Sequence, residues 1–464
     1  MVSPTKIESS LPDPWQIYAR CGKATKIINS CRRHGQLSRC YQSLDRPLCS
    51  KQLKQNQDFI FWVPRRLPDG KSTSILSSRL SRSLEQYPKW FDALRTFATR
   101  AHDERRVLVT HPKTAADRFV RRVAQLYSIP LIDFRPFPAT LDAPFFRTFS
   151  RRTAVVFYHA INSNYAKQRD ELLASVVDEA ITLAVRRNGK VFNANTKRLR
   201  VKKRSLVLVD NSTKMTSKST LEALLDQGAV GWFLPSNERH RKASSKNRFP
   251  QPKPNLVPSK RRRLTRDQIN PNDYLIHWTR RCHGHWPDQL ENDYLDDLIF
   301  NRPRSWHDAL STLCRITASK KLIASPHLMR DKLPMICFSE IPLFELQKHR
   351  RFRTHMARWD ANPYGIAIKK KWLQKEGAKP VIYGNEITFN RLSDSDRPFY
   401  QPATNRSGNL DWSSEREWRL AGSLDLSKVP IEDAFLFVAK DQDAEILEGL
   451  TNFPIHVMDV ENRN

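Results

Sequence analysis

The sequence predicts an α/β half followed by an α+β half, and three observations lead to that fold class. In residues 58–233 short apolar segments alternate with longer amphipathic ones. This alternation is typical of a parallel, doubly wound sheet, because each parallel crossover needs a helix to return the chain. After residue 271 strands and helices follow no regular alternation, as in α+β domains. The length of 464 residues exceeds what one hydrophobic core usually organises, so we expect two folded domains.

The expected elements follow from apolar periodicity and from turn residues. In the first half, strands are expected over residues 59–63, 107–110, 130–133, 154–157, 189–192, 205–210 and 229–233. Helices are expected over residues 81–102, 114–127, 168–186 and 219–227, with Asp178 and Glu179 on the surface of the third. In the second half, strands are expected over residues 274–279, 335–339, 365–368, 380–383, 417–420 and 434–438, and helices over residues 305–316 and 341–353.

Composition divides the chain into four parts. Residues 1–51 are expected to be a poorly ordered leader, 52–236 an α/β domain, 237–269 a basic linker and 270–464 an α+β domain. The leader contains thiols and one imidazole, but no two of its cysteines have the close spacing of structural zinc sites. Zinc binding by this group is therefore the minor alternative. The residues concerned are Cys21, Cys31, His34, Cys40 and Cys49.

The charge balance indicates a polyanionic partner. Lysine and arginine total 79 against 48 acidic residues, a formal net charge of +31. Cationic side chains gain affinity for nucleic acid by releasing condensed counterions, without reading sequence. Nucleic acid is therefore the first candidate partner, with nucleotide phosphates and anionic lipid headgroups behind it. A merely well-solvated basic surface is the alternative.

The chain has no apolar run of membrane-spanning length, and its first residues lack the basic and apolar regions of a secretory signal. Its seven cysteines are an odd number spread over a long chain, unlike the disulfide framework of a small secreted domain. We therefore expect a cytoplasmic protein with reduced thiols and no membrane partner. The sequence does not indicate an oligomeric state.

The first half lacks both common glycine-rich phosphate-binding motifs, GxGxxG and GxxxxGK[ST]. Any nucleotide would be held by other groups just past the strand ends, where open α/β sheets bind ligands. Helix caps and ordinary loop residues are the competing interpretation. The candidates are Thr110, His111, Lys113, Thr114, Asp117, His159, Asn162 and Asp210.

The order of strands and helices, together with residues 177–199, resembles Rossmann-like nucleotide-sensing domains found beside DNA-processing and phage-defence domains. In this reading a helix carrying Asp-Glu-Ala precedes a glycine-containing turn. The resemblance implies an α/β Rossmann-like N-terminal domain plus the α+β C-terminal domain, and a nucleotide as the ligand of the first.

Four motifs recur in order in the second half: CFSE at 337–340, YGIAI at 364–368, GAKPVIY at 377–383 and EREWR at 415–419. Together they resemble abortive-infection (phage-resistance) proteins, which implies a role in phage defence. The resemblance covers most of the second half and none of the first. Glu415 and Glu417 are expected on one face of a strand, because alternate strand residues share a face.

A more distant resemblance is to ADP-ribosyltransferases, with NAD as the substrate. It implies that Glu417 stabilises the oxocarbenium-like transition state and that Glu415 activates the acceptor. A fixed carboxylate suits the positive charge that develops when a glycosidic bond breaks. The NAD-binding residues expected with them are His277, Thr279, Ser339 and Tyr364.

The same residues are also compatible with other interpretations. The glutamates of 415–419 also fit a charged edge strand that pairs with nearby arginines. Cys337 with His277 would form a nucleophile pair, although a buried inert thiol is the commoner situation. The cluster at 277–286 contains further His and Cys residues, without the spacing of a metal site. The competing functions are a non-enzymatic nucleic-acid-binding protein and an antitoxin-like interaction protein.

Overall fold

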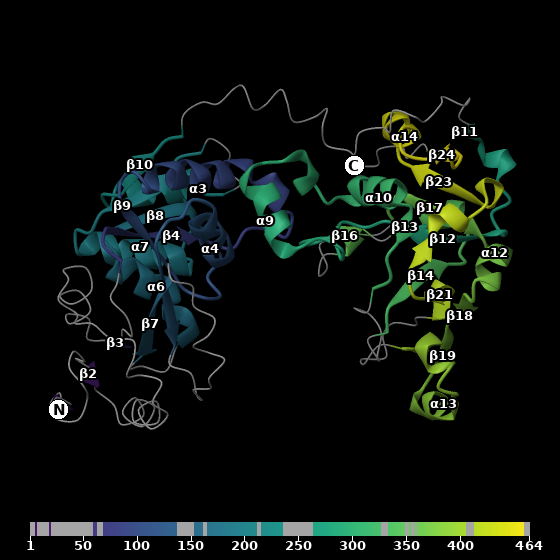
Figure 1. Ribbon diagram of the computed structural model, residues 1–464, viewed down its shortest axis with the longest axis horizontal. Helices are drawn as coiled ribbons and strands as arrows, with labels where there is room; N and C mark the ends of the chain where they lie inside the picture. The colour runs from purple at the N-terminus through teal and green to yellow at the C-terminus, as the bar shows by residue number, and fades with distance from the viewer. Residues whose placement is uncertain are drawn as a thin grey trace. The chain divides into compact units, whose positions relative to one another are not determined.

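The computed structural model divides into two compact units, each described here by itself (Figure 1). The first unit contains residues up to Glu238 together with Asn292–Arg302, and the second contains Arg239–Glu291 and Pro303–Asn464. Residues 292–302, expected in the C-terminal domain, therefore belong to the first unit. The structure describes residues 5–6, 18–19, 59–62, 68–136, 153–160, 165–210, 215–234, 263–325, 333–348, 352–353, 358–359, 361–404 and 413–458.

The first unit contains an eight-stranded sheet of order β10-β9-β8-β4-β5-β6-β7-β3. Every neighbouring pair from β10 to β7 is parallel, and β3 joins β7 antiparallel, so the α/β prediction is confirmed as a parallel sheet of seven strands. A separate pair, β1 and β2, is antiparallel. The strands are β1 (Thr5–Lys6), β2 (Tyr18–Ala19), β3 (Phe59–Trp62), β4 (Lys71–Ser77), β5 (Arg106–Thr110), β6 (Leu131–Pro136), β7 (Thr153–Ala160), β8 (Glu179–Ala184), β9 (Ser205–Leu208) and β10 (Val230–Trp232).

Helices cover both faces of this sheet. One face packs against α3 and α4 through Trp90 and Phe119, and Tyr294 of α9 belongs to the same apolar cluster. The other packs against α6, α7 and α8 through apolar residues such as Leu172 and Leu224. Strands buried on both faces explain the continuous apolar runs that predicted them. The helices are η1 (Leu84–Gln86), α3 (Pro88–Ala101), α4 (Asp117–Leu126), α6 (Tyr165–Val176), α7 (Lys190–Arg200), α8 (Lys218–Leu225) and α9 (Glu291–Ile299).

Two predictions in the middle of this unit are wrong. The helix expected over residues 168–186 ends at Val176, and β8 follows it, fully buried along its length. The strand expected over residues 189–192 is instead the start of α7. The stretch 177–199, which carried the Rossmann-like resemblance, is thus strand, turn and helix rather than helix and turn. A short apolar run fits a helix segment or a buried strand equally well by periodicity.

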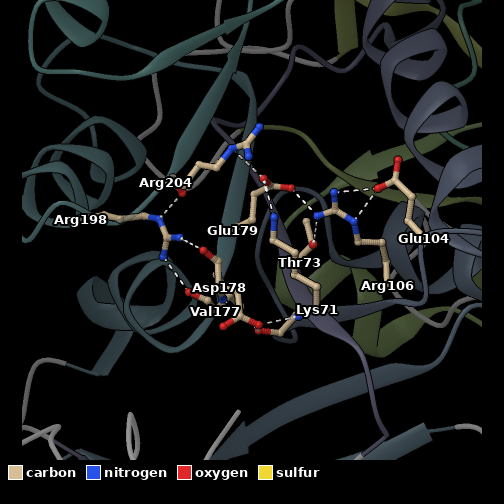
Figure 2. A network of polar contacts seen from close by, with 10 residues as sticks. Lys71, Thr73, Glu104, Arg106, Val177, Asp178, Glu179, Arg198 and Arg204 are labelled. Carbon is tan, nitrogen blue, oxygen red and sulfur yellow. Dashed lines mark hydrogen bonds and ion pairs between the residues drawn. The ribbon is translucent and has the colours of Figure 1, made fainter. Parts of the chain in front are cut away.

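A polar network closes the amino edge of the parallel sheet (Figure 2). Glu179 is only 2% exposed and forms ion pairs with Lys71 at 3.2 Å, with Arg204 at 3.0 Å and with Arg106. Burial alone would raise the pKa of Glu179, but hydrogen bonds and charge from Arg106 and Lys71 outweigh it and lower that pKa. The buried Arg198 donates to backbone oxygens of Val177, Asp178, Arg204 and Ala174.

The second unit contains an eight-stranded mixed sheet of order β11-β24-β23-β17-β12-β14-β21-β18. One face packs against α10, α12 and α14 through residues such as Leu313, Leu373 and Leu447. The other face carries Phe435 and Phe437 and packs against Leu343 of α11. Mixed pairing with helices on one main face is the α+β arrangement predicted from the sequence.

The strands of the second unit are β11 (Arg263–Leu264), β12 (Tyr274–Trp278), β13 (Lys321–Leu322), β14 (Met335–Ser339), β15 (Phe352–Arg353), β16 (Arg358–Trp359), β17 (Gly365–Lys369), β18 (Lys379–Pro380), β19 (Ile382–Gly384), β20 (Tyr400–Pro402), β21 (Glu417–Ala421), β22 (Leu424–Asp425), β23 (Ala434–Val438) and β24 (Ile455–Val457). Its α-helices are α10 (Ala309–Ser319), α11 (Leu343–Lys348), α12 (Lys370–Lys375), α13 (Glu386–Arg391) and α14 (Asp441–Glu448). Its 3-10 helices are η3 (Arg266–Gln268), η4 (Pro303–Ser305), η6 (Arg397–Phe399), η7 (Ser413–Glu415), η8 (Leu426–Lys428) and η9 (Ile431–Asp433).

Candidate functional site

The carboxyl edge of the parallel sheet contains the point where the strand order reverses. The chain lays β5, β6 and β7 on one side of β4, and β8, β9 and β10 on the other. Helices leaving β4 and β8 therefore start on opposite faces, and the loops between them diverge. Open α/β sheets bind ligands at such a switch point. Here it lies beyond Ser77 and Ala184.

Hydrogen bonds tie the two loops at this point together. Ser78 N donates to Ala184 O at 2.7 Å, and Arg186 N donates to Ser78 Oγ at 3.1 Å. The guanidinium of Arg186 donates to the carbonyl oxygen of Arg79 at 2.7 Å. The backbone at the switch point is thus fixed by both loops, and side chains that point outward from it are held in a defined place.

Three arginines at this point face solvent. Arg79, Arg186 and Arg187 are all exposed, and within the residues the structure describes none of them forms an ion pair. Arg187 only donates to the backbone oxygen of Ser219, at 3.4 Å. Lys190, at the first position of α7, is also exposed. The three arginines, without ion pairs in the described residues, give a local positive potential that attracts phosphate groups, whereas the charge of Lys190 interacts with Asp170.

Helix α7 begins at the same place and has no side-chain cap. Gly189 is its N-cap residue, preceded by Asn188 in the left-handed conformation at φ 58°. The neighbouring α8, by contrast, is capped by Ser217, whose hydroxyl accepts from Thr220 N. The start of a helix carries a partial positive charge from its uncapped N–H groups, which favours anions. The start of α7 and the three arginines thus add potential of the same sign.

The candidates predicted after β5 mostly bond to each other. Thr110 Oγ1 donates to Asp117 at 2.9 Å, and Thr114 Oγ1 donates to the His111 oxygen at 2.9 Å. His111 is 2% exposed, and burial, with a smaller contribution from Arg169, lowers its pKa to about 4. These groups hold the loop between β5 and α4 in place.

The remaining candidates of the first half are an exposed lysine, an ion-paired aspartate and two residues whose side chains lie outside the described ranges. Lys113 is exposed, with its backbone at φ 68°. Asp210 forms an ion pair with Lys89 and has a nearly buried side chain. The side chain of His159 and the whole of Asn162 lie outside the described residues, as do the five leader residues considered for zinc. Sequence analysis did not select the three arginines, although the pair at 186–187 directly after an apolar run was a usable signal.

In the second unit, strand register separates the predicted catalytic groups. Ser339 lies opposite Glu417 on one side and opposite Ile276 on the other, so these three share a face of the sheet. His277 follows Ile276 and therefore lies on the opposite face. Its Nδ1 donates to the carbonyl oxygen of Cys337 at 2.9 Å, and its burial lowers its pKa. The register brings the hydroxyl and the carboxylate together, and leaves the imidazole apart from both.

The carboxylate of Glu417 is paired with Arg419, with Oε1 and Nε 3.1 Å apart. Arg419 is 2% exposed and also donates to Tyr400 O at 2.9 Å and to Gln401 Oε1 at 2.6 Å. The expected placement of Glu415 on the same strand face is wrong, because it belongs to η7 and β21 begins at Glu417. This ion pair matches the alternative interpretation of the EREWR motif, in which its glutamates pair with nearby arginines.

The other predicted residues of this group make structural contacts. Thr279 Oγ1 donates to backbone oxygens of Ala309 at 2.9 Å and Tyr364 at 3.1 Å. The Tyr364 hydroxyl donates to Asp443 at 3.0 Å. Burial, followed by the charge and hydrogen bond of Glu417, raises the pKa of the Cys337 thiol to about 12. A thiol with so high a pKa is protonated at neutral pH and is a poor nucleophile.

The described residues contain neither a metal-binding group nor a membrane-spanning helix. No three His, Cys, Asp or Glu side chains in the described ranges are grouped so that they would hold a metal ion. Among the helices placed by the structure, none has both the length and the apolar character that crossing a bilayer requires.

Comparison with known proteins gives limited similarity. No family model matches the chain, and no curated protein matches its sequence. Two solved structures of DNA processing protein A are similar in fold. That from Helicobacter pylori, described as binding single-stranded DNA, has 15% identity, a TM-score of 0.28, and coverage of 40% of this chain and 87% of that one. That from Streptococcus pneumoniae has 8% identity, a TM-score of 0.32, and coverage of 44% and 74%.

The molybdenum cofactor carrier protein from Chlamydomonas reinhardtii is also similar, with 13% identity, a TM-score of 0.25, and coverage of 35% of this chain and 89% of that one. At these TM-scores the similarities do not establish a function for this chain. None of the three proteins is an abortive-infection protein or an ADP-ribosyltransferase.

Proposed function

We propose that the first unit binds the phosphate backbone of nucleic acid at the carboxyl edge of its parallel sheet. The observation that carries this proposal is the group formed by Arg79, Arg186 and Arg187, exposed and without ion pairs in the described residues, on both sides of the switch point. Elsewhere in the same unit, basic side chains such as Arg106 and Arg121 are paired with acids. Cations left unpaired at a ligand-binding edge therefore mark it as a site for anions.

A polymer of phosphates fits this edge better than a single nucleotide. The cations are spread over the loops after β4 and β8, and glycine-rich phosphate-binding turns are absent from the sequence. Each neutralised phosphate releases counterions, so affinity accumulates over several weak contacts. The formal net charge of +31 adds a long-range attraction to the same class of partner.

The test compares two matched pairs of substitutions in the full-length protein. One variant carries Arg186→Gln and Arg187→Gln at the carboxyl edge. The control carries Arg200→Gln and Lys202→Gln, which removes the same charge from exposed positions at the end of α7 and in the turn before β9. Binding of labelled oligonucleotides, single-stranded and duplex, is measured by fluorescence anisotropy over a range of salt concentrations.

We expect the carboxyl-edge variant to lower the slope of log affinity against log salt by roughly 1.4 to 1.8, the share of two phosphate contacts. The control variant is expected to leave that slope close to the wild-type value. Equal losses from both pairs would mean that the net charge, and no defined site, governs binding. Displacement of the oligonucleotide by micromolar mononucleotide would instead indicate a nucleotide site and overturn the proposal.

The NAD-dependent ADP-ribosyl transfer implied by the second half stays a prediction. The pairing of Glu417 with Arg419 and the position of His277 on the other face give it no support from geometry. Incubation with labelled NAD and nucleic acid or lysate, comparing wild type with Glu417→Gln, tests it directly. Label transfer that the substitution abolishes would favour this enzymatic function.

A further inference from the structure

Phe233 is an exposed aromatic residue at the same edge of the parallel sheet as the three arginines. It directly follows β10, and β10 runs parallel to β9, so Phe233 lies at the carboxyl edge. Among the side chains that the structure describes, it is the one aromatic ring that faces solvent, at 71% exposed. Large aromatic rings are mostly buried in a core or in an interface. An exposed ring at a ligand-binding edge is therefore a candidate contact for the ligand.

Neighbouring side chains hold the ring of Phe233 in place. Its Cε2 atom lies 3.4 Å from the position that a Cβ atom at Gly231 would take. The side chains of Val209 and Leu225 reach the same position, at 3.2 and 3.8 Å. The glycine thus leaves the space into which the ring leans. One side of the ring is packed and most of it is exposed, so it presents a preorganised contact surface.

The ring of Phe233 and the cations lie on the same side of the sheet. Leu225 is the last residue of α8, so the ring that it contacts lies on the face covered by α7 and α8. Arg187 donates to Ser219 O in the first turn of α8. In the strand order, β9 alone separates β10 from β8 (Figure 1). Two strand spacings place Phe233 roughly 10 Å along the edge from the end of β8, which the arginines follow.

A single strand of nucleic acid offers both kinds of group that this edge can bind. Its phosphates suit the arginines, and its unpaired bases have π faces that stack on aromatic side chains. In a duplex the bases are paired and stacked on each other, so a ring on the protein surface does not reach their faces. A distance of roughly 10 Å corresponds to no more than about three nucleotides at the rise of ~3.4 Å per nucleotide of a stacked strand. One short segment can therefore contact both.

We propose that the carboxyl edge of the first unit binds single-stranded nucleic acid, with one base stacked on Phe233 and nearby phosphates on Arg186 and Arg187. This inference rests on the proposed nucleic-acid binding and adds the class of nucleic acid. The arginines favour this occupant over an apolar protein surface, because they would lose their water there without gaining an opposite charge. Every base has a π face, so the site accepts different sequences.

The experiment measures binding to the full-length protein by fluorescence anisotropy. The probes are labelled oligothymidylate, its duplex with oligoadenylate, and an abasic oligonucleotide of the same length. Wild type is compared with Phe233→Leu, which keeps an apolar side chain without a π face, and with Phe233→Trp, which keeps the π face. The control is Val201→Ala, which removes exposed apolar surface at the end of α7, where Val201 is 65% exposed.

We expect Phe233→Leu to bind oligothymidylate about tenfold more weakly than wild type, and Phe233→Trp and Val201→Ala to bind it as wild type does. Affinities for the duplex and the abasic probe should be the same in all four proteins. The salt dependence should not change, because no phosphate contact is lost.

Wild-type affinity of Phe233→Leu for oligothymidylate overturns the inference, as does an equal loss on the duplex or the abasic probe. Wild-type protein that binds the abasic probe as tightly as oligothymidylate also overturns it, whatever the stability of the variants. Unchanged affinity together with a fall in mass from dimer to monomer in Phe233→Leu would show that the ring contacts a second copy of the chain instead.

Failure of this inference and failure of the proposed function give different results. If the substitutions at Arg186 and Arg187 lower the salt slope while Phe233→Leu binds as wild type does, phosphate binding stands and base stacking falls. If wild type binds none of the probes, or if the arginine substitutions act no differently from their control, the proposed function falls and this inference falls with it.

Discussion

Both edges of the parallel sheet in the first unit carry basic side chains, but they use them in opposite ways. At the amino edge Lys71, Arg106 and Arg204 converge on the buried carboxylate of Glu179 (Figure 2). At the carboxyl edge Arg186 and its neighbours face solvent without ion pairs in the part of the chain that the structure describes. Arginines of the same unit thus stabilise a buried carboxylate at one edge and remain exposed to solvent at the other.

Strand direction gives the physical reason. In a parallel sheet all strands start at one edge and end at the other, so each edge gathers loops of one kind. Helices end near the amino edge, where Arg198 donates to the backbone oxygens of Ala174, in the last turn of α6, and of Val177, just after it. Helices begin at the carboxyl edge, and their N–H groups favour anions from outside the protein. At the first edge Lys71 and Arg106 are paired internally, whereas at the second Arg186 and Arg187 face solvent, although the pair of Lys89 with Asp210 also lies at this edge.

The largest expected effect comes from removing the acid at the closed edge. Glu179→Gln removes the buried counter-charge of Arg106 and leaves it only the more exposed Glu104, so we expect the free energy of unfolding to fall by about 3 kcal/mol. Urea unfolding, with amide hydrogen exchange of β4 and β8 to identify the first unit, measures the loss. Glu222→Gln, which removes an exposed acid 3.9 Å from Lys218, is the control and should change stability little. Equal effects would mean that the amino edge is not closed by this carboxylate.

The lowered pKa of Glu179 predicts that the free energy of unfolding depends on pH. Because Arg106 and Lys71 lower the pKa of Glu179 in the folded state, its contribution is present above its unfolded pKa and is lost as pH falls through the folded value. Wild type should therefore lose stability in acid more steeply than Glu179→Gln. Parallel stability curves for the two proteins below pH 5 would contradict the closed network.

A smaller loss is expected from Arg198→Met. The methionine keeps much of the apolar volume but removes the guanidinium bonds to the carbonyl oxygens of Val177, Asp178 and Arg204, of which Arg204 O keeps a bond of 3.4 Å from Ala180 N. Unsatisfied buried acceptors cost energy, while removal of a buried charge returns part of it, so we expect a net loss of about 2 kcal/mol. Hydrogen exchange at the end of α6 should report the change locally. An unchanged exchange rate there would show that these bonds do not hold the helix end.

Apolar patterning predicted most of this sheet but not its two central strands, β4 and β8. The runs after Arg106 and Ser205 are continuous and apolar, because parallel strands covered on both faces must be. The strand β4 reads KSTSILS, and its polar residues Ser72 and Thr73 are buried all the same. Ser72 satisfies its N–H and hydroxyl through Asp178, a partner 106 residues away that no local pattern reveals.

The candidate site was harder to predict than the fold. Residues after strand ends were selected by type, and most of them, such as Thr110 and Asp117, proved to bond to one another. What distinguishes Arg186 and Arg187 is the absence of an acidic partner in the described residues, which depends on the strand order. In the second unit the motif EREWR was visible, but the pairing of Glu417 with Arg419 needed the structure.

A further prediction concerns the side-chain cap that α8 has and α7 lacks. Ser217→Ala removes the hydroxyl that accepts from Thr220 N, and we expect the free energy of unfolding to fall by about 1 kcal/mol. Gly189→Ala is not an equivalent change, because α7 has no side-chain cap to lose. Ser219→Ala, at an exposed position in the first turn of α8, serves as the control. Similar urea midpoints for Ser217→Ala and wild type would argue against a structural role for this cap.

Arg187→Gln is expected to change stability the least, although it should weaken oligonucleotide binding. Arg187→Gln removes an exposed cation whose only bond in the described residues is a long one to Ser219 O, so the free energy of unfolding should change by no more than about 0.5 kcal/mol. The salt dependence of oligonucleotide binding should nevertheless fall by the share of one phosphate contact. Arg198 gives the opposite expectation, a loss of stability without a loss of salt dependence. If Arg187→Gln unfolds the protein as readily as Arg198→Met does, the carboxyl edge is held together by its arginines, and the contrast between the two edges disappears.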